Sequence, residues 1–310
     1  MNTSSDNHAE IHKRAYAAMD RGDLQSASDD FDLLLRMEPN DRFYHYMQGL
    51  VRKYSFNWRA SLVHNLRAIE LDTEFGEAEH WNAAIAATAL GDWAQARRLW
   101  AALSIKLHED EGPIHDDFGV AVVRLNPWNG GETVFMRRID PVRGRLLNVP
   151  LPESGHRFGD IVLHDGARTG SRYDGDVQVP VFNELVRLVP SDFQTFVVFV
   201  SCKQPEDIQE LLASNLPGIG YVEDWTETVR YYCMRCSYGT THKHDFDDES
   251  GWQNDRNLGI AAQSRASVDK LLQVWKNAGH ERTIDGIETN EQPIPDREDG
   301  HVWWHGPEEE

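Results

Sequence analysis

A repeat of about 34 residues in the first third of this chain limits the folds that it can adopt. Trp58 lies 34 residues after Leu24, and Trp93 lies 35 residues after Trp58. Each of these three residues follows a short turn and opens a stretch in which apolar residues have helical spacing. Self-similarity at this period is typical of stacked helical hairpins, which are too small to bury their apolar faces alone. We therefore expect three hairpins, over residues 10–37, 41–71 and 75–107.

Small, aromatic and proline residues recur at corresponding positions of these hairpins. They are Ala27, Phe31, Leu34 and Pro39 in the first copy, Gly49, Ser61 and Ala68 in the second, and Ala84, Ala96, Trp100 and Leu103 in the third. On these residues, the stretch from roughly 8 to 108 resembles the tetratricopeptide repeat (TPR) family. The pattern is degenerate, because Ala15 stands where the family usually has glycine and the second and third copies lack the closing proline. The resemblance implies a helical domain that binds peptides or protein elements.

In the TPR family the first helix of each hairpin lines a concave groove, so the resemblance also implies a set of partner-binding residues. They are His12, Tyr16, Met19, Phe43, Tyr46, Leu50, Lys53, Trp81, Ile85 and Thr88. Many of these side chains are large and apolar, which suits a surface that binds another protein. The alternative is that they pack against the C-terminal domains or a neighbouring hairpin, since three repeats make only a short groove.

The remainder of the chain changes its pattern twice. Short apolar runs separated by turns come first and are typical of a small β-barrel. The order strand, helix, strand, loop, strand, helix, strand then favours a ferredoxin-like α+β sandwich. The predicted fold is thus multidomain, α then α+β. Its domains are a TPR-like domain at 1–110, a small β domain at 114–190, a ferredoxin-like domain at 193–289 and an acidic mobile tail at 290–310. The whole layout also resembles uncharacterised bacterial TPR-containing proteins.

Several local expectations accompany this division. Residues 1–10 are polar and are expected to fray. The Asp165-Gly166 turn is expected to end a short strand, and Pro180 to interrupt the strand pattern that follows, because proline has no N–H for a ladder. In the tail, Trp303 and Trp304 could anchor an otherwise mobile segment on a groove.

Composition narrows the class of partner. The chain carries 51 acidic and 31 basic residues, a formal net charge of −20. This excess disfavours a nucleic-acid surface, which relies on clustered Lys and Arg, and it would attract a basic protein. The alternative is that the acidity only keeps the protein in solution. No run is apolar and long enough for a signal peptide or a membrane span, and three cysteines suggest no disulfide framework, so we expect a cytoplasmic protein.

The sharpest chemical pattern is a possible metal site formed by Cys233, Cys236, His242 and His244. Two cysteines spaced as CxxC and two nearby histidines can complete a tetrahedral shell, and Zn²⁺ suits this ligand set. Four protein ligands leave no open position, so the metal would be structural. The alternative is a solvated loop in which the cysteines only pack.

A second cluster, His156, Asp160, His164 and Asp165, contains groups that could serve acid–base chemistry. Turn formation and capping hydrogen bonds explain it better, because no nucleophile lies beside it and no nucleotide-binding or hydrolase motif is present. We therefore assign no catalytic residue.

The favoured function is a non-enzymatic interaction protein that binds a basic protein partner, for example a bacterial immunity protein or antitoxin that neutralises a toxin. The alternative is a metal- or small-ligand-binding regulator, or an enzyme, with its site in the β domains. The sequence does not indicate the oligomeric state.

Overall fold

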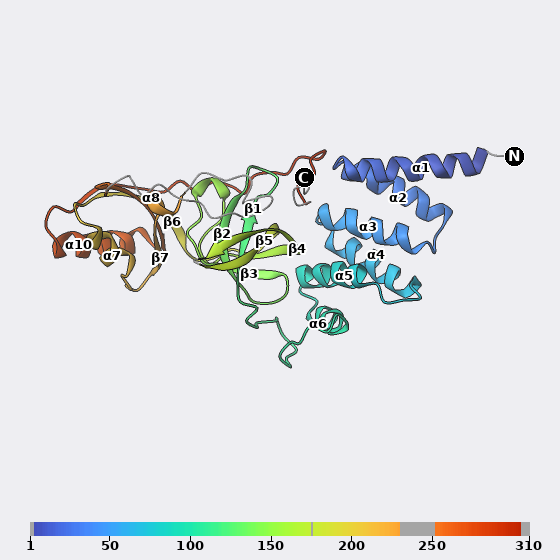
Figure 1. Cartoon of the computed structure of the whole chain (residues 1–310), viewed down its shortest axis with the longest axis horizontal. Coiled ribbons are helices and arrows are strands. Elements are labelled where there is room, and N and C mark those ends of the chain that lie inside the picture. The colour runs from blue at the N-terminus through green and yellow to red at the C-terminus, as the bar shows by residue number, and fades with distance from the viewer. Residues whose placement is uncertain (1–2, 175, 230–251, 305–310) are drawn as a thin grey trace. The chain divides into compact units, whose positions relative to one another are not determined.

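The structure is a computed structural model, which describes residues 3–174, 176–229 and 252–304 (Figure 1). The chain divides into two compact units. Of the described residues, the helical unit comprises 3–117, 139–142 and 297–304. The β unit comprises the described residues of 118–138 and 143–296. This layout, helical and then α+β, is the one expected from the sequence.

Six consecutive helices build the helical unit as three antiparallel hairpins (Figure 1). They are α1 (Thr3–Asp20), α2 (Leu24–Met37), α3 (Arg42–Tyr54), α4 (Trp58–Leu71), α5 (Glu77–Leu90) and α6 (Trp93–Ala102). The second helix of each hairpin begins with a side-chain cap, because Asp23, Asn57 and Asp92 each accept a hydrogen bond from the N–H three residues later. The expectation that residues 1–10 fray was wrong for the described part of this stretch, since α1 already begins at Thr3.

The hairpins bury their apolar faces against one another. Phe31 and Trp100 are fully buried, and the Phe31 ring packs edge-on against Tyr16 at 5.3 Å between centroids. Where α3 and α4 cross, a Cβ on Gly49 would lie 2.5 Å from the amide nitrogen of Asn65. Only glycine therefore permits this close approach, which is the role that the repeat pattern assigns to a small residue.

Five strands of the β unit form a closed barrel. They are β1 (Val120–Leu125), β2 (Glu132–Arg138), β3 (Arg143–Leu146), β4 (Ile161–Asp174) and β5 (Val177–Val189). Neighbouring strands are antiparallel, and a parallel pairing of β1 with β5, in register at Val122 and Val181, closes the barrel. Its core contains an apolar cluster that includes Met136 and Leu146, both fully buried.

Two expectations about these strands were wrong. β4 does not end at Asp165-Gly166, because irregular pairing with β5 lets the strand continue past this point to Asp174. Gly166 has a φ of 76°, a left-handed conformation that suits such an irregularity. Pro180 does not interrupt β5, in which it is paired with Ser171 of β4.

The second sheet of the β unit has four antiparallel strands in the order β7-β8-β6-β9. The strands are β6 (Gln194–Ser201), β7 (Ile219–Asp224), β8 (Asp255–Ala262) and β9 (Thr283–Glu288). Helix α7 (Pro205–Leu212) connects β6 to β7, the short α8 (Trp225–Thr228) follows β7, and α10 (Arg265–Ala278) connects β8 to β9. The apolar stripes of α7 and α10 cover the sheet through residues such as Leu211 and Trp275. Of the helices described, none has both the length and the apolar character needed to cross a bilayer.

Candidate functional site

The predicted groove residues fall into an accessible and a buried set. His12, Tyr16, Phe43, Tyr46, Leu50 and Trp81 are exposed or half-buried, whereas Met19, Lys53, Ile85 and Thr88 are buried. Phe43 is the clearest surface residue, with 56% of its area exposed. The first set can therefore contact a partner in this conformation, while the second contributes to packing within the helical unit.

Lys53 illustrates why a polar side chain of this set is buried. Its Nζ donates a hydrogen bond of 2.9 Å to Oδ1 of Asn82 on α5, and it lies 4.4 Å from the ring centroid of Tyr54. Both contacts compensate for the loss of water around the ammonium group. This lysine joins α3 to α5 and is not presented to solvent.

The helical unit contains a second contact surface, which the groove prediction missed. Residues 297–304, hereafter the tail segment, lie across the turns of the first two hairpins. The backbone N–H of Leu24 donates to Oδ1 of Asp299 at 2.9 Å, and the N–H of Gly300 donates to the carbonyl of Gly22 at 2.9 Å. A Cβ on Gly22, where φ is 77°, would lie 2.7 Å from the backbone of His301. The first turn thus fits the tail segment closely.

Two tryptophans hold the tail segment against the second hairpin. The Trp304 ring stacks on Tyr54 at 4.5 Å between centroids, and the Trp303 ring stacks on Phe56 at 6.0 Å. Trp303 and Trp304 are only 6% and 4% exposed. These two residues are buried, as the anchored alternative to a mobile tail requires. We call Gly22, Leu24, Tyr54 and Phe56 the tail-binding surface.

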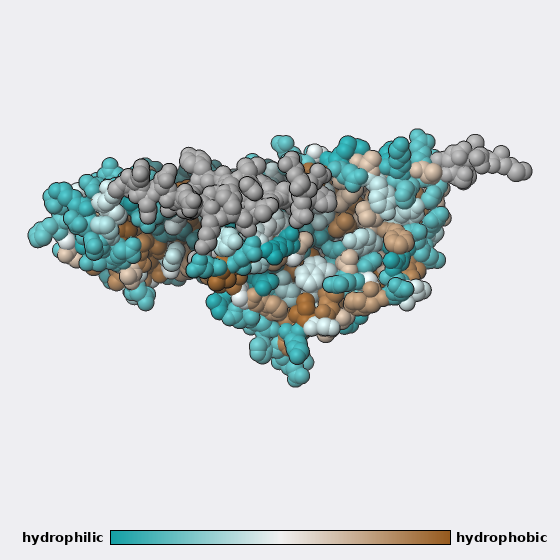
Figure 2. All heavy atoms as spheres, viewed as in Figure 1, coloured by the Kyte–Doolittle hydropathy of each residue, from teal (hydrophilic) through white to brown (hydrophobic). Residues whose placement is uncertain are grey.

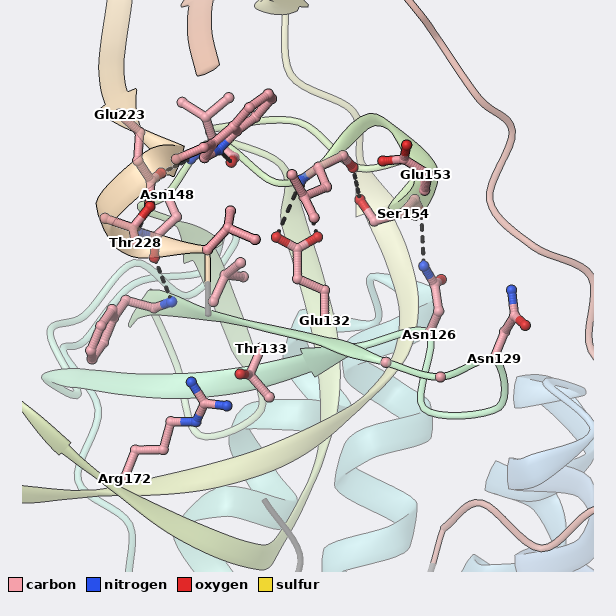
Figure 3. A pocket seen from close by; sticks show the side chains of 18 of the residues that line it. Asn126, Asn129, Glu132, Thr133, Asn148, Glu153, Ser154, Arg172, Glu223 and Thr228 are labelled. Carbon is pink, nitrogen blue, oxygen red and sulfur yellow. Dashed lines mark hydrogen bonds between the residues drawn. The ribbon is translucent and has the colours of Figure 1, made fainter. Parts of the chain in front are cut away.

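A cavity of about 670 Å³ lies within the β unit (Figure 3). It is lined by the first half of β2, the segment from Asn148 to Ser154, and the end of β7 with α8. The segment from Asn148 to Ser154 ends in the short helix η1 (Pro152–Ser154). Residues that are distant in sequence therefore meet here, since β2 belongs to the barrel and β7 to the second sheet. Volumes of roughly 300–1,000 Å³ are usual for small-molecule sites.

Two glutamates are held inside this cavity by the backbone between Asn148 and Leu151. Glu132 accepts a hydrogen bond from the N–H of Leu151, at 3.2 and 3.1 Å to its two oxygens. Glu223, which is 7% exposed, accepts from the N–H of Val149 at 2.7 Å and from Nδ2 of Asn148 at 3.0 Å. Figure 3 shows both carboxylates turned toward this segment. One short stretch of chain thereby places two acidic groups in one cavity.

The cavity shifts the titration of both carboxyl groups. Burial raises the pKa of Glu132 from 4.5 to about 8, against the lowering effect of the hydrogen bond from Leu151, and the nearby Glu223 adds a smaller increase. Burial also raises the pKa of Glu223, although its hydrogen bonds from Val149 and Asn148 oppose the change. Titratable groups with shifted pKa values in a cavity are typical of functional sites.

The predicted acid–base cluster has a structural explanation in the barrel. His156 Nε2 lies 2.6 Å from Oε1 of Glu184, and both side chains are almost completely buried. Burial alone would lower the pKa of His156, but the Glu184 carboxylate and its hydrogen bond raise it, and the net pKa is raised. Asp160 is buried and accepts hydrogen bonds from the N–H groups of Arg157 and Ser191, at 3.0 and 2.6 Å. These contacts tie loops to the barrel.

His164 is also fully buried, with its ring stacked on Phe182 at 4.6 Å between centroids. Burial lowers the pKa of His164 from 6.5 to about 3, with a smaller decrease from Arg138. The imidazole is thus neutral at ordinary pH, and its Nδ1 accepts the N–H of Gly166 at 3.1 Å. It acts as a packed core residue.

The four predicted zinc ligands, Cys233, Cys236, His242 and His244, lie outside the described residues. Within the ranges that the structure does describe, no group of three or more His, Cys, Asp or Glu side chains is placed to hold a metal ion. Cys202, the cysteine described, is buried, and burial raises the pKa of its thiol to about 11.

Comparison with known proteins gives limited information. No family model matches the chain, and no curated protein matches it. Among solved structures, the TPR2B domain of yeast Sti1 in its complex with pHsp70 is 17% identical, with a TM-score of 0.29, and the match covers 31% of this chain and 75% of that one. A mutant O-GlcNAc transferase of Thermobaculum terrenum is 18% identical, with a TM-score of 0.30, covering 34% of this chain and 20% of that one. Neither match identifies a family for this chain.

Proposed function

We propose that this chain binds a protein partner through its helical unit, and that the tail-binding surface recognises an extended segment with aromatic side chains. The observation that carries this proposal is the tail segment itself. Its two tryptophans are almost fully buried on Tyr54 and Phe56, and Asp299 caps α2. A surface that holds one extended aromatic segment in this way has the chemistry to hold another.

The accessible residues of the predicted groove offer a further contact area on the helical unit. Phe43 is 56% exposed, and the half-buried Tyr16, Tyr46 and Trp81 each keep part of their surface in contact with solvent. In the space-filling view, hydrophobic patches are scattered among hydrophilic atoms over the helical unit (Figure 2). Aromatic side chains among polar ones are typical of the residues that dominate protein interfaces.

The charge of the chain supports a basic protein as the partner. A net charge of −20 accelerates association with a positively charged protein and opposes association with acidic ones. An immunity protein or antitoxin that neutralises a basic toxin in the cytoplasm is one form of this proposal.

We interpret the domains as three TPR-like hairpins, a small barrel and a ferredoxin-like sandwich. The strand order β7-β8-β6-β9 of the second sheet supports the ferredoxin-like part of this interpretation.

The test uses the full chain and a labelled peptide with the sequence of residues 293–304. In the double variant Trp303→Ala, Trp304→Ala, the chain's own tail should no longer occupy the surface. We expect this variant to bind the peptide at least tenfold more tightly than the wild type, in which the tethered tail competes at an effective concentration on the order of millimolar. Fluorescence anisotropy measures both affinities.

Matched controls separate this surface from others. Adding Tyr54→Ala to the double variant should abolish the gain, whereas adding Val63→Ala, at a residue of α4 that is 59% exposed, should leave it unchanged. A peptide with both tryptophans replaced by alanine should not bind. If the double variant fails to bind the native peptide, the tail-binding surface is not a recognition surface.

A structural zinc ion at Cys233, Cys236, His242 and His244 also remains a proposal, supported by the ligand spacing alone. Protein purified without a metal-affinity tag should contain close to one zinc ion per chain, and Cys233→Ser should lose it. Metal-free protein in both cases would contradict this proposal.

A further inference from the structure

The cavity of the β unit has apolar walls, with acidic groups both inside it and at its edge. Val134 and Val149 are buried in its walls, and Trp225, which is 7% exposed, donates its indole N–H to the carbonyl of Val149 at 3.0 Å. Glu132 and Glu223 lie inside, while Glu153 and Glu227 are exposed at its edge. The walls can therefore contact the apolar part of a ligand, and the carboxylates can bind its polar end.

The two inner carboxylates retain unused hydrogen-bonding capacity. A carboxylate offers about four acceptor positions, and the Leu151 N–H is the donor that the structure gives Glu132. Glu223 receives donors from Val149, Asn148 and the side chain of Thr228. The buried Asn126, which also lines the cavity, donates to the carbonyl of Ser154 at 2.8 Å, while its Oδ1 has no hydrogen-bond partner among the described residues. The surplus of acceptors calls for a ligand that donates hydrogen bonds.

Among ligands that donate hydrogen bonds, the charge of the cavity lining favours cations. Four glutamates and one arginine, Arg172, line the cavity. Glu227 is compensated in part, because Nη2 of Arg256 donates to it at 2.7 Å. The remaining carboxylates outnumber the arginine, and a tryptophan wall further favours a cation. An anionic or neutral ligand gains neither the attraction to the carboxylates nor the cation–π contact with the tryptophan.

We propose that this cavity binds an organic cation, an ammonium or guanidinium group on a short apolar chain. The cationic group lies between Glu132 and Glu223 and donates to both, and the apolar chain packs against Val149, Leu151 and Trp225. The ligand is either a free small amine or the side chain of a lysine or arginine of a partner, since both carry the same chemistry. The site lies entirely in the β unit, so this inference is independent of the proposed role of the tail-binding surface.

The titration of Glu132 provides a signature of such binding. With a pKa raised to about 8, Glu132 is mostly protonated at pH 7 in the empty cavity. A bound cation favours the carboxylate and lowers this pKa, so binding releases a proton. The affinity for an amine should therefore rise as the pH increases from 6 to 9, in a range where the amine itself stays charged.

The experiment is isothermal titration of the full chain with n-pentylamine, with n-pentanol as the uncharged match and Nα-acetyl-lysine amide as the side-chain probe. We expect saturable binding of pentylamine or of the lysine amide at concentrations below about 1 mM and none of pentanol. Preference for the lysine amide assigns the site to a partner's side chain, and preference for pentylamine assigns it to a free amine. Equal binding of pentanol, or binding of neither amine, overturns the proposal.

Variants and proton counting test the geometry. Glu132→Gln and Glu223→Gln should each weaken amine binding at least tenfold, whereas Glu206→Gln, at an exposed residue of α7, should change it less than twofold. Titration of the wild type at pH 7 in two buffers of different ionisation enthalpy should show release of about one proton per ligand. This measurement does not depend on the folding of any variant, and a release of zero protons overturns the role given to Glu132.

Discussion

In the helical unit, residues that are close in space are mostly close in sequence, whereas the β unit brings distant segments together. Each hairpin contacts the next along the chain, from α1 to α6, and the parts of the unit that are distant in sequence are Ile139–Val142 and the tail segment. In the β unit, Val122 pairs with Val181 to close the barrel, and Glu132 meets Glu223 in the cavity. A site on the helical unit is therefore built from residues of one hairpin or of neighbouring hairpins. The cavity is built from segments distant in sequence, so its shape depends on the packing of the whole β unit.

The largest effect that would test this comparison is expected from a core residue of the first hairpin. Phe31→Ala removes a fully buried ring and should lower the free energy of unfolding of the helical unit by about 3–5 kcal/mol. Hydrogen exchange followed by mass spectrometry reports each unit separately. We expect faster exchange throughout α1 to α6, because stacked hairpins stabilise one another, and unchanged exchange in the barrel.

The control for this variant is Val63→Ala, at a residue that is 59% exposed, which should change the stability by no more than about 0.5 kcal/mol. Equal loss of protection in the barrel after Phe31→Ala would show that the two units unfold together, which contradicts their independent stability.

The same contrast explains what the sequence could predict. The helices followed from the period between Leu24, Trp58 and Trp93, because local spacing and caps decide helical hairpins. The strands were located, but the length of β4 was not, because its continuation past Gly166 depends on irregular pairing with β5. Strand pairing depends on two segments, so the sequence of one segment alone does not predict it.

The candidate sites show more clearly what could not be predicted from the sequence. Glu132 and Glu223 carry no local motif, and only the fold shows that one backbone stretch holds both. The groove residues came from the resemblance to a family, and whether they bind a partner stays a prediction. The tail segment was signalled by Trp303 and Trp304, whose apolar character is unusual in a polar tail, but the sequence did not identify Tyr54 and Phe56 as their contacts.

The pH dependence of stability should expose the acidic cavity. Glu132 has a pKa of about 8 in the folded chain and near 4.5 when unfolded. Between these values the folded state holds a proton that the unfolded state has lost, so this group makes stability fall as the pH rises from about 5 to 8. In Glu132→Gln this contribution should vanish, and urea denaturation at several pH values should show a flatter alkaline limb. Glu206→Gln should keep the wild-type slope.

His164 should have the opposite effect on the acid side. Its pKa is about 3 in the folded chain, against 6.5 for the free side chain, so the unfolded state binds a proton that the folded state excludes. Stability should therefore fall as the pH drops from about 6.5 toward 3. His164→Asn retains an acceptor for the N–H of Gly166 and should weaken this acid dependence, at some cost in stability at neutral pH because the stacking on Phe182 is lost. An unchanged acid limb in this variant would assign the effect to other groups.

The smallest predicted effect compares a local with a long-range cap on the same helix. Asp23 accepts the N–H of Ser26 within the first turn of α2, whereas Asp299 reaches the N–H of Leu24 from the far end of the sequence. Asp23→Ala and Asp299→Ala should each cost about 1 kcal/mol in the wild type. In the double variant Trp303→Ala, Trp304→Ala, the cost of Asp299→Ala should disappear, because a released tail segment cannot cap the helix, while the cost of Asp23→Ala should persist. A double-mutant cycle measures this difference. If Asp299→Ala costs the same in both backgrounds, the tryptophans do not hold the tail segment, and the tail-binding surface loses its main support.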